Sequence, residues 1–87
     1  MRATKEQIEA WLVELGQLLG PFGADPAFER ALLEVEWLQG ELAAGRLELP
    51  VPSTGDLYLP YALTEGLLDD VPEVVDAATR VVEALLD

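Results

Sequence analysis

The sequence predicts a mainly α-helical protein: a small domain of three helices, with a short β-hairpin or extended arm between the second and third. Three stretches place apolar residues three and four positions apart, which is the spacing of one helix face. Between them, residues 46–61 alternate with a period of two, which is typical of strands. A length of 87 residues permits one domain, which we take as residues 1–87, and 51% hydrophobic residues can supply its core.

The first helix is expected over residues 4–20. Thr4 and Gln7 have the spacing of a capping box, in which each side chain satisfies an amide at the helix start. Gly20 and Pro21 then end the helix. Its apolar face comprises Ile8, Trp11, Leu12, Leu15, Leu18, Leu19 and Phe22.

The second helix is expected over residues 26–44. Asp25 is a good N-cap, and Pro26 suits the first turn because its missing N–H has no acceptor there. Gly45 closes the helix. The main apolar face comprises Phe28, Ala31, Leu32, Val35, Leu38 and Leu42.

This second helix also carries apolar residues away from its main face. At 100° per residue, Leu33, Trp37 and Ala44 lie far round the helix, with Gly40 near them. A surface helix normally has one apolar face. Either this helix is central, with the other two on different sides, or Leu33 and Trp37 form an exposed patch that meets a partner.

Residues 46–61 predict a hairpin whose loop is the turn-rich segment 52–55. Pro50 and Pro60 cannot donate ladder hydrogen bonds, so both strands would be edge strands. An isolated hairpin is marginal in water, so it would pack on the helices or pair with another chain. An extended loop without strands is the alternative. The alternating apolar positions are Leu47, Leu49 and Val51, then Leu57, Leu59 and Tyr61.

After a possible helical turn at residues 62–68, the third helix is expected over residues 71–86. Asp70 and Glu73 have capping-box spacing at its start. Apolar positions at helical spacing then continue to the C-terminus. We expect the core to include Trp11, Leu15, Leu32, Val35, Leu38, Val75, Val82 and Leu85.

The charge is strongly acidic: 17 acidic against 5 basic residues give −12. Nucleic acid and anionic membranes are disfavoured as partners, because both are bound through Lys and Arg. Neither a membrane-spanning apolar run nor a signal peptide is recognisable, so a cytoplasmic location is expected. The absence of Cys and Asn, with a single Met, fits a thermophile and fits GC-rich codon usage equally well.

The residue types argue against an enzyme. The chain has no Cys and no His, so the commonest metal ligands and general bases are missing. Ser53 is its only serine and Lys5 its only lysine. The acidic cluster of Asp69, Asp70 and Glu73 could hold a hard cation, but helix capping accounts for these residues. We therefore expect no catalytic residue, no metal and no cofactor.

Two segments invite comparison with a known family: Gly55–Tyr61, with the sequence GDLYLPY, and Asp69–Val75, with the sequence DDVPEVV. They resemble the immunity proteins of colicin-type nucleases. That family consists of small acidic four-helix proteins, whose short third helix carries a motif of the type Asp-Leu-Ile-Tyr-Tyr-Pro. Here Leu59 separates the two tyrosines, and the proline precedes the second one. The resemblance implies that Tyr58 would contact a basic nuclease, with Glu34 and Glu41 as acidic counterparts.

The expected function is a small acidic protein-interaction module that associates with itself as a homodimer. The residues expected at the interface are Leu33, Trp37, Tyr58 and Tyr61. The alternative function is an acidic inhibitor, or immunity-type protein, that blocks a basic nucleic-acid-binding or nuclease surface. An inhibitor of this kind would gather its carboxylates on one face, whereas charge that only maintains solubility would be spread.

Overall fold

Four α-helices account for most of the computed structural model, which describes residues 4–47 and 57–86. A 3₁₀ turn, η1, follows the first helix. Apolar faces of the helices meet in one shared core. The elements are α1 (Lys5–Leu19), η1 (Gly20–Phe22), α2 (Pro26–Ala43), α3 (Tyr58–Thr64) and α4 (Pro72–Leu86).

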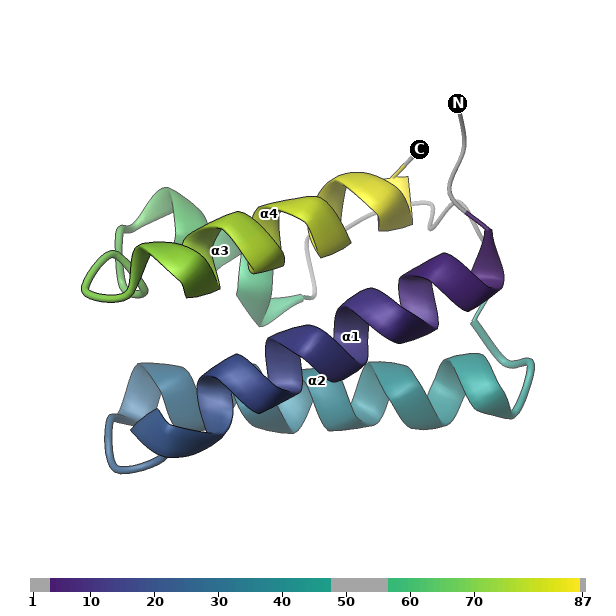
Figure 1. Ribbon diagram of the computed structural model, residues 1–87, viewed down its shortest axis with the longest axis horizontal. Helices are drawn as coiled ribbons and strands as arrows, with labels where there is room; N and C mark the ends of the chain where they lie inside the picture. The colour runs from purple at the N-terminus through teal and green to yellow at the C-terminus, as the bar shows by residue number, and fades with distance from the viewer. Residues whose placement is uncertain (1–3, 48–56, 87) are drawn as a thin grey trace.

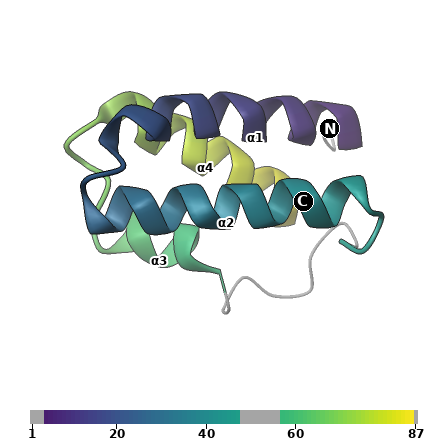
Figure 2. The same cartoon turned by 90° about the horizontal axis from the view of Figure 1, so that it is seen from below.

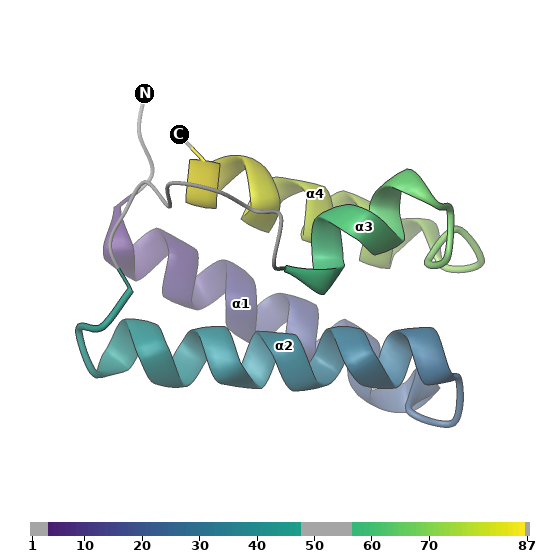
Figure 3. The same ribbon diagram turned by 180° about the vertical axis from the view of Figure 1, so that it is seen from behind.

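The long helices α1 and α2 form an antiparallel pair, and the other two helices lie over it (Figure 1). α4 packs on α1, whereas the short α3 packs on α2 and on α4. Seen from behind, α3 lies in front of α4 and above the start of α2 (Figure 3). Seen from below, α2 lies between α1 and α3, with its outer side toward the viewer (Figure 2).

Capping interactions at the starts of α1 and α2 confirm the predicted N-caps. The Thr4 hydroxyl accepts a hydrogen bond from the Gln7 amide at 3.1 Å, and the Gln7 side chain accepts one from the Thr4 amide at 2.9 Å. The Asp25 carboxylate accepts from the Ala27 amide at 2.9 Å. Such caps satisfy amides that have no partner within the helix, so the helix starts were readable from the sequence.

Two glycines with positive φ end α2 and α3. Gly45 has φ 74° and Gly66 has φ 70°, a left-handed conformation that costs other residues about 1–2 kcal/mol. After α2, the Gly45 amide donates to the Leu42 carbonyl and the Arg46 amide to the Glu41 carbonyl. After α3, the Gly66 amide likewise donates to the Leu63 carbonyl and the Leu67 amide to the Ala62 carbonyl. Both helices therefore end in a Schellman motif, and Gly45 does so as predicted.

Substituting alanine at Gly66 and at Gly40 is expected to change stability in opposite directions. Gly66→Ala should lower the free energy of unfolding by about 1–2 kcal/mol, because alanine is strained at positive φ. Gly40→Ala should raise it by about 0.5–1 kcal/mol, because Gly40 lies inside α2 and a Cβ there meets no atom within 4 Å. Urea denaturation at low protein concentration measures the free energy of unfolding of both variants. Changes of the same sign would contradict the backbone conformations of Gly66 and Gly40 described here.

Half of the positions predicted for the core are fully buried, and the other half lie at its margin. Leu15, Val35, Leu38 and Leu85 are fully buried, while the other four pack against the core with part of their surface exposed. Each long helix contributes a set of buried residues at helical spacing. Core positions missing from the prediction include Ile8, Leu12, Leu19, Phe28, Leu59, Leu68, Val74 and Val81.

The prediction of a hairpin is wrong for its second strand, because Tyr58–Thr64 is the helix α3. The period of two fails at Tyr61, which is 56% exposed, whereas Leu59 and Ala62 are buried at helical spacing. The first strand falls mainly on residues 48–56, outside the described residues. The described part of the chain thus contains four helices rather than three. Four helices with a short third one is the architecture that the resemblance to the immunity proteins implies.

Two features explain why this stretch is helical: the position of Pro60 and a cap supplied by a distant residue. Pro60 occupies the third position of α3, where the missing N–H needs no acceptor within the helix. Leu57 stands at the N-cap position and has no side chain that could cap. The cap is supplied instead by Glu34, which lies far away in the sequence on α2. No rule of local sequence spacing would detect such a cap.

Candidate protein-binding surface

Leu33 and Trp37 of α2, with Tyr58 and Tyr61 of α3, form what we call the α2–α3 surface. Leu33 is 57% exposed, Trp37 53% and Tyr61 56%, whereas Tyr58 is half-buried. All four were singled out from the sequence. The structure places them on two helices that pack directly against each other (Figure 2).

The exposed residues of α2 lie on the side opposite to the core. Its buried residues follow one face, whereas Leu33, Trp37, Gly40 and Ala44 are all exposed. Leu33 and Trp37 are therefore exposed, as the second sequence interpretation expects, and the helices α1 and α4 do not lie on two different sides of α2, as the first requires. The reason is the packing of α4, which lies on α1 and α3 and leaves the outer side of α2 uncovered by the described residues. That the exposed residues meet a partner stays a prediction.

Glu34 fixes α3 to α2. One carboxylate oxygen accepts a hydrogen bond from the Tyr58 amide at 2.6 Å, and the other accepts one from the Leu59 amide at 2.8 Å. These are the first two amides of α3, so Glu34 caps a helix that begins 24 residues further along the chain. A negative charge at this position is also favoured by the helix dipole.

Arg30 of α2 contacts Tyr58 of α3, and Tyr58 contacts Tyr61 of the same helix. The Arg30 guanidinium lies 4.7 Å from the centre of the Tyr58 ring, within the range of a cation–π contact. The Tyr58 and Tyr61 rings follow at a centroid distance of 5.9 Å, tilted by 47°. Tyr58 therefore contacts both Arg30 of α2 and Tyr61 of its own helix.

Glu41 is also paired within the chain, at the other end of α2. Its carboxylate accepts two hydrogen bonds from the Arg46 guanidinium, at 2.8 and 3.3 Å. The hydrogen bond and then the charge of Glu41 raise the pKa of Arg46 above its usual value. The two carboxylates that the immunity-protein resemblance assigns to a basic partner thus both have contacts inside this chain, with Glu34 committed to α3.

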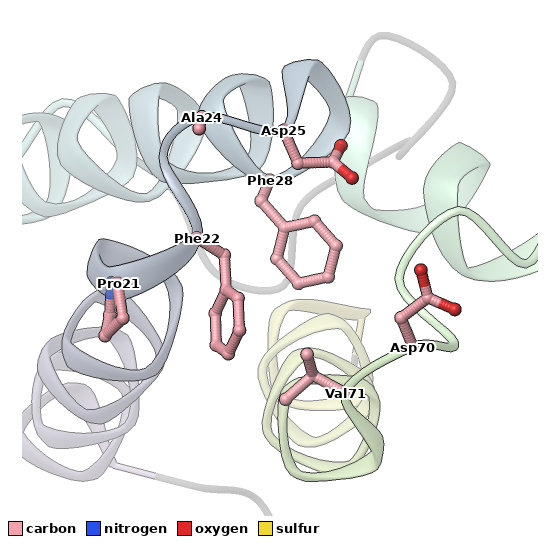
Figure 4. A pocket seen from close by; sticks show the side chains of 7 residues that line it. All are labelled: Pro21, Phe22, Ala24, Asp25, Phe28, Asp70 and Val71. Carbon is pink, nitrogen blue, oxygen red and sulfur yellow. The ribbon is translucent and has the colours of Figure 1, made fainter.

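A shallow pocket of about 340 Å³ lies at the end of the molecule where α2 and α4 begin (Figure 4). The rings of Phe22 and Phe28 form one side, with their centroids 5.3 Å apart. Asp25 caps α2 there, and Asp70 reaches the pocket from the other side. Neither a nucleophile nor a nitrogen base lines this pocket. Its lining consists of Pro21, Phe22, Ala24, Asp25, Phe28, Asp70 and Val71.

Other kinds of site find little support in residues 4–47 and 57–86. Within these ranges no three acidic side chains are grouped so that they could hold a metal ion, Asp69, Asp70 and Glu73 included. None of the helices in the same ranges has the length and apolar composition to cross a membrane. The described carboxylates are spread over α1, α2, the segment 65–70 and α4. Comparisons with protein-family models, curated proteins and solved structures gave no match.

Proposed function

We propose that the protein is an interaction module that binds protein through the α2–α3 surface and associates with a second copy of itself. The observation that carries the proposal is the exposure of Leu33 and Trp37 on the side of α2 opposite to the core. Contiguous apolar patches exposed on a fold are typical of interaction sites. Aromatic residues, and Trp above all, supply much of the binding energy at protein interfaces.

The α2–α3 surface is held in place before any partner arrives. α2 is anchored by fully buried residues such as Val35 and Leu38, and Glu34 caps the start of α3. Tyr58 contacts Arg30 of α2. A surface that is already ordered loses little conformational entropy on binding, which favours association.

Self-association is tested by reversing the character of one exposed leucine. Leu33→Glu should weaken the dimer by about a hundredfold in dissociation constant, because each interface then receives two desolvated carboxylates in place of apolar contacts. Trp37→Glu should have an effect of at least that size. Leu86→Glu is the matched control, since Leu86 is 49% exposed on α4 and should leave the dimer unchanged. Sedimentation equilibrium measures the mass against 9.5 kDa for one chain.

Dependence on salt separates self-association from the alternative, an acidic inhibitor of a basic surface. Two chains of charge −12 repel each other, so added salt should strengthen the homodimer by screening that repulsion. Binding to a basic partner should instead weaken steeply with salt. The spread of the described carboxylates over several helices gives less support to a single acidic face. A chain that stays monomeric at about 1 mM and at high salt would contradict self-association.

A further inference from the structure

We infer that α2 pairs with α2 of a second copy in antiparallel orientation, so that Arg30 of each copy faces Glu41 of the other. This inference rests on the proposed function and specifies its partner and its geometry. It starts from the seam that runs along the outer side of α2. The seam consists of Arg30, Leu33, Trp37, Gly40 and Ala44.

Spacing and exposure make this seam suitable for pairing with another helix. Its residues are separated by three, four, three and four positions, which is the alternation of a two-helix interface. All five are exposed. A Cβ at Gly40 would meet no atom within 4 Å, so this chain's own packing does not explain the glycine. Glycine inside a helix costs stability, and a neighbouring helix or a long side chain can use the space that it leaves.

Charge decides the direction of pairing. Arg30 and Glu41 are eleven residues apart, which places them about 20° from each other around α2 and on the same flank of the seam. A two-fold axis that relates antiparallel helices keeps equal flanks on the same side, so each Arg30 meets the Glu41 of the other copy. A parallel pair, related by a two-fold axis along the helices, would instead place the two flanks on opposite sides of the interface, so that Arg30 would not meet Glu41.

Arg30 is available for this contact. The described part of the chain offers it no ion pair, and the residue is exposed. Tyr58 stacks on the guanidinium at 4.7 Å, which leaves the N–H donors in the guanidinium plane free to meet a carboxylate. Glu41 can accept from a second guanidinium while it keeps Arg46, because a carboxylate has about four acceptor positions.

The same register fills the centre of the interface with apolar contacts. With Arg30 near Glu41 of the second copy, Leu33 of each copy falls opposite Trp37 of the other, and Gly40 opposite Arg30. Nearly the whole of α2, about 27 Å, then overlaps. A standard interface covers about 800 Å² per partner, which is about 15% of the 5166 Å² surface here. A single pair of helices covers less, so we expect a dissociation constant in roughly the micromolar range.

Charge reversal tests the register by sedimentation equilibrium of the full chain. Arg30→Glu and Glu41→Arg should each weaken the dimer by about tenfold, because each places like charges at both ends of the seam. The double variant restores opposite charges and should return to within about threefold of the wild type. Arg80→Glu is the control, since it changes the net charge as Arg30→Glu does but replaces an arginine that pairs with Glu14 on α1. It should change the dissociation constant less than about twofold.

The outcomes separate this inference from the proposed function. Restoration in the double variant supports the antiparallel register. Additive weakening in the double variant, or single variants without effect, would overturn the register even if Leu33→Glu still disrupts the dimer. If neither Leu33→Glu nor the charge variants alter the mass, the proposed self-association falls as well. Circular dichroism of every variant checks that weakening does not come from unfolding.

Discussion

Alanine in place of Leu59 is expected to lower the free energy of unfolding by about 2–5 kcal/mol, the range for leucines that leave a cavity in a packed core. Leu59 is fully buried and lies in α3, which packs on both α2 and α4. The loss is a large part of the total, since a chain of this size has a stability of about 4–13 kcal/mol. Urea denaturation followed by circular dichroism measures the change.

Leu86→Ala is the control for this measurement, because it removes the same atoms from an exposed position on α4. Its effect should stay within about 0.5 kcal/mol. A small effect at Leu59 as well would mean that α3 is not part of the cooperative core. The hairpin predicted from the sequence would then need to be considered again for residues 57–61.

Removing the Glu34 carboxylate by Glu34→Ala is expected to cost about 1–3 kcal/mol. The amides of Tyr58 and Leu59 would lose their acceptor at a half-buried helix start, where water replaces it incompletely. Because α2 itself does not depend on this contact, the loss should be concentrated in α3. NMR chemical shifts of residues 58–64 and urea denaturation give the local and the global readout.

Glu36→Ala is the matched substitution for Glu34. It replaces the same residue type two positions further along α2, where the side chain is exposed and forms no ion pair within residues 4–47 and 57–86. Stability should change by less than about 0.5 kcal/mol. Equal costs at both positions would show that the Glu34 effect arises from general charge rather than from capping.

The three long helices were predictable from the sequence because their signals are local. A cap such as Thr4 or Asp25 acts on amides two or three residues away, and Gly45 acts on carbonyls of the preceding turn. The short helix α3 has no such cap at its start. Its first amides depend on Glu34. The alternation of Leu57, Leu59 and Tyr61 is typical of a strand, but it spans the start of α3, since Leu57 stands at the N-cap position and the helix begins at Tyr58.

The residues of the α2–α3 surface were found from the sequence, but their exposure was not. Periodicity shows that Leu33 and Trp37 lie away from the main apolar face of α2, and it leaves open whether another helix covers them. The answer depends on where α4 packs, which is a contact between residues far apart in the chain. The contact of Arg30 with Tyr58 could not be predicted from the sequence for the same reason, since the two residues are 28 positions apart.

The Glu34 cap also bears on the order in which the chain folds. An isolated helix of seven residues is unstable in water, and its first amides find their acceptor only once α2 has formed. α3 should therefore form after the pairing of α1 and α2, and it should be lost before that pair during partial unfolding. The amide protons of α3 should exchange with solvent earlier than those in the middle of α2, because α3 can open locally before the shared core unfolds as a whole.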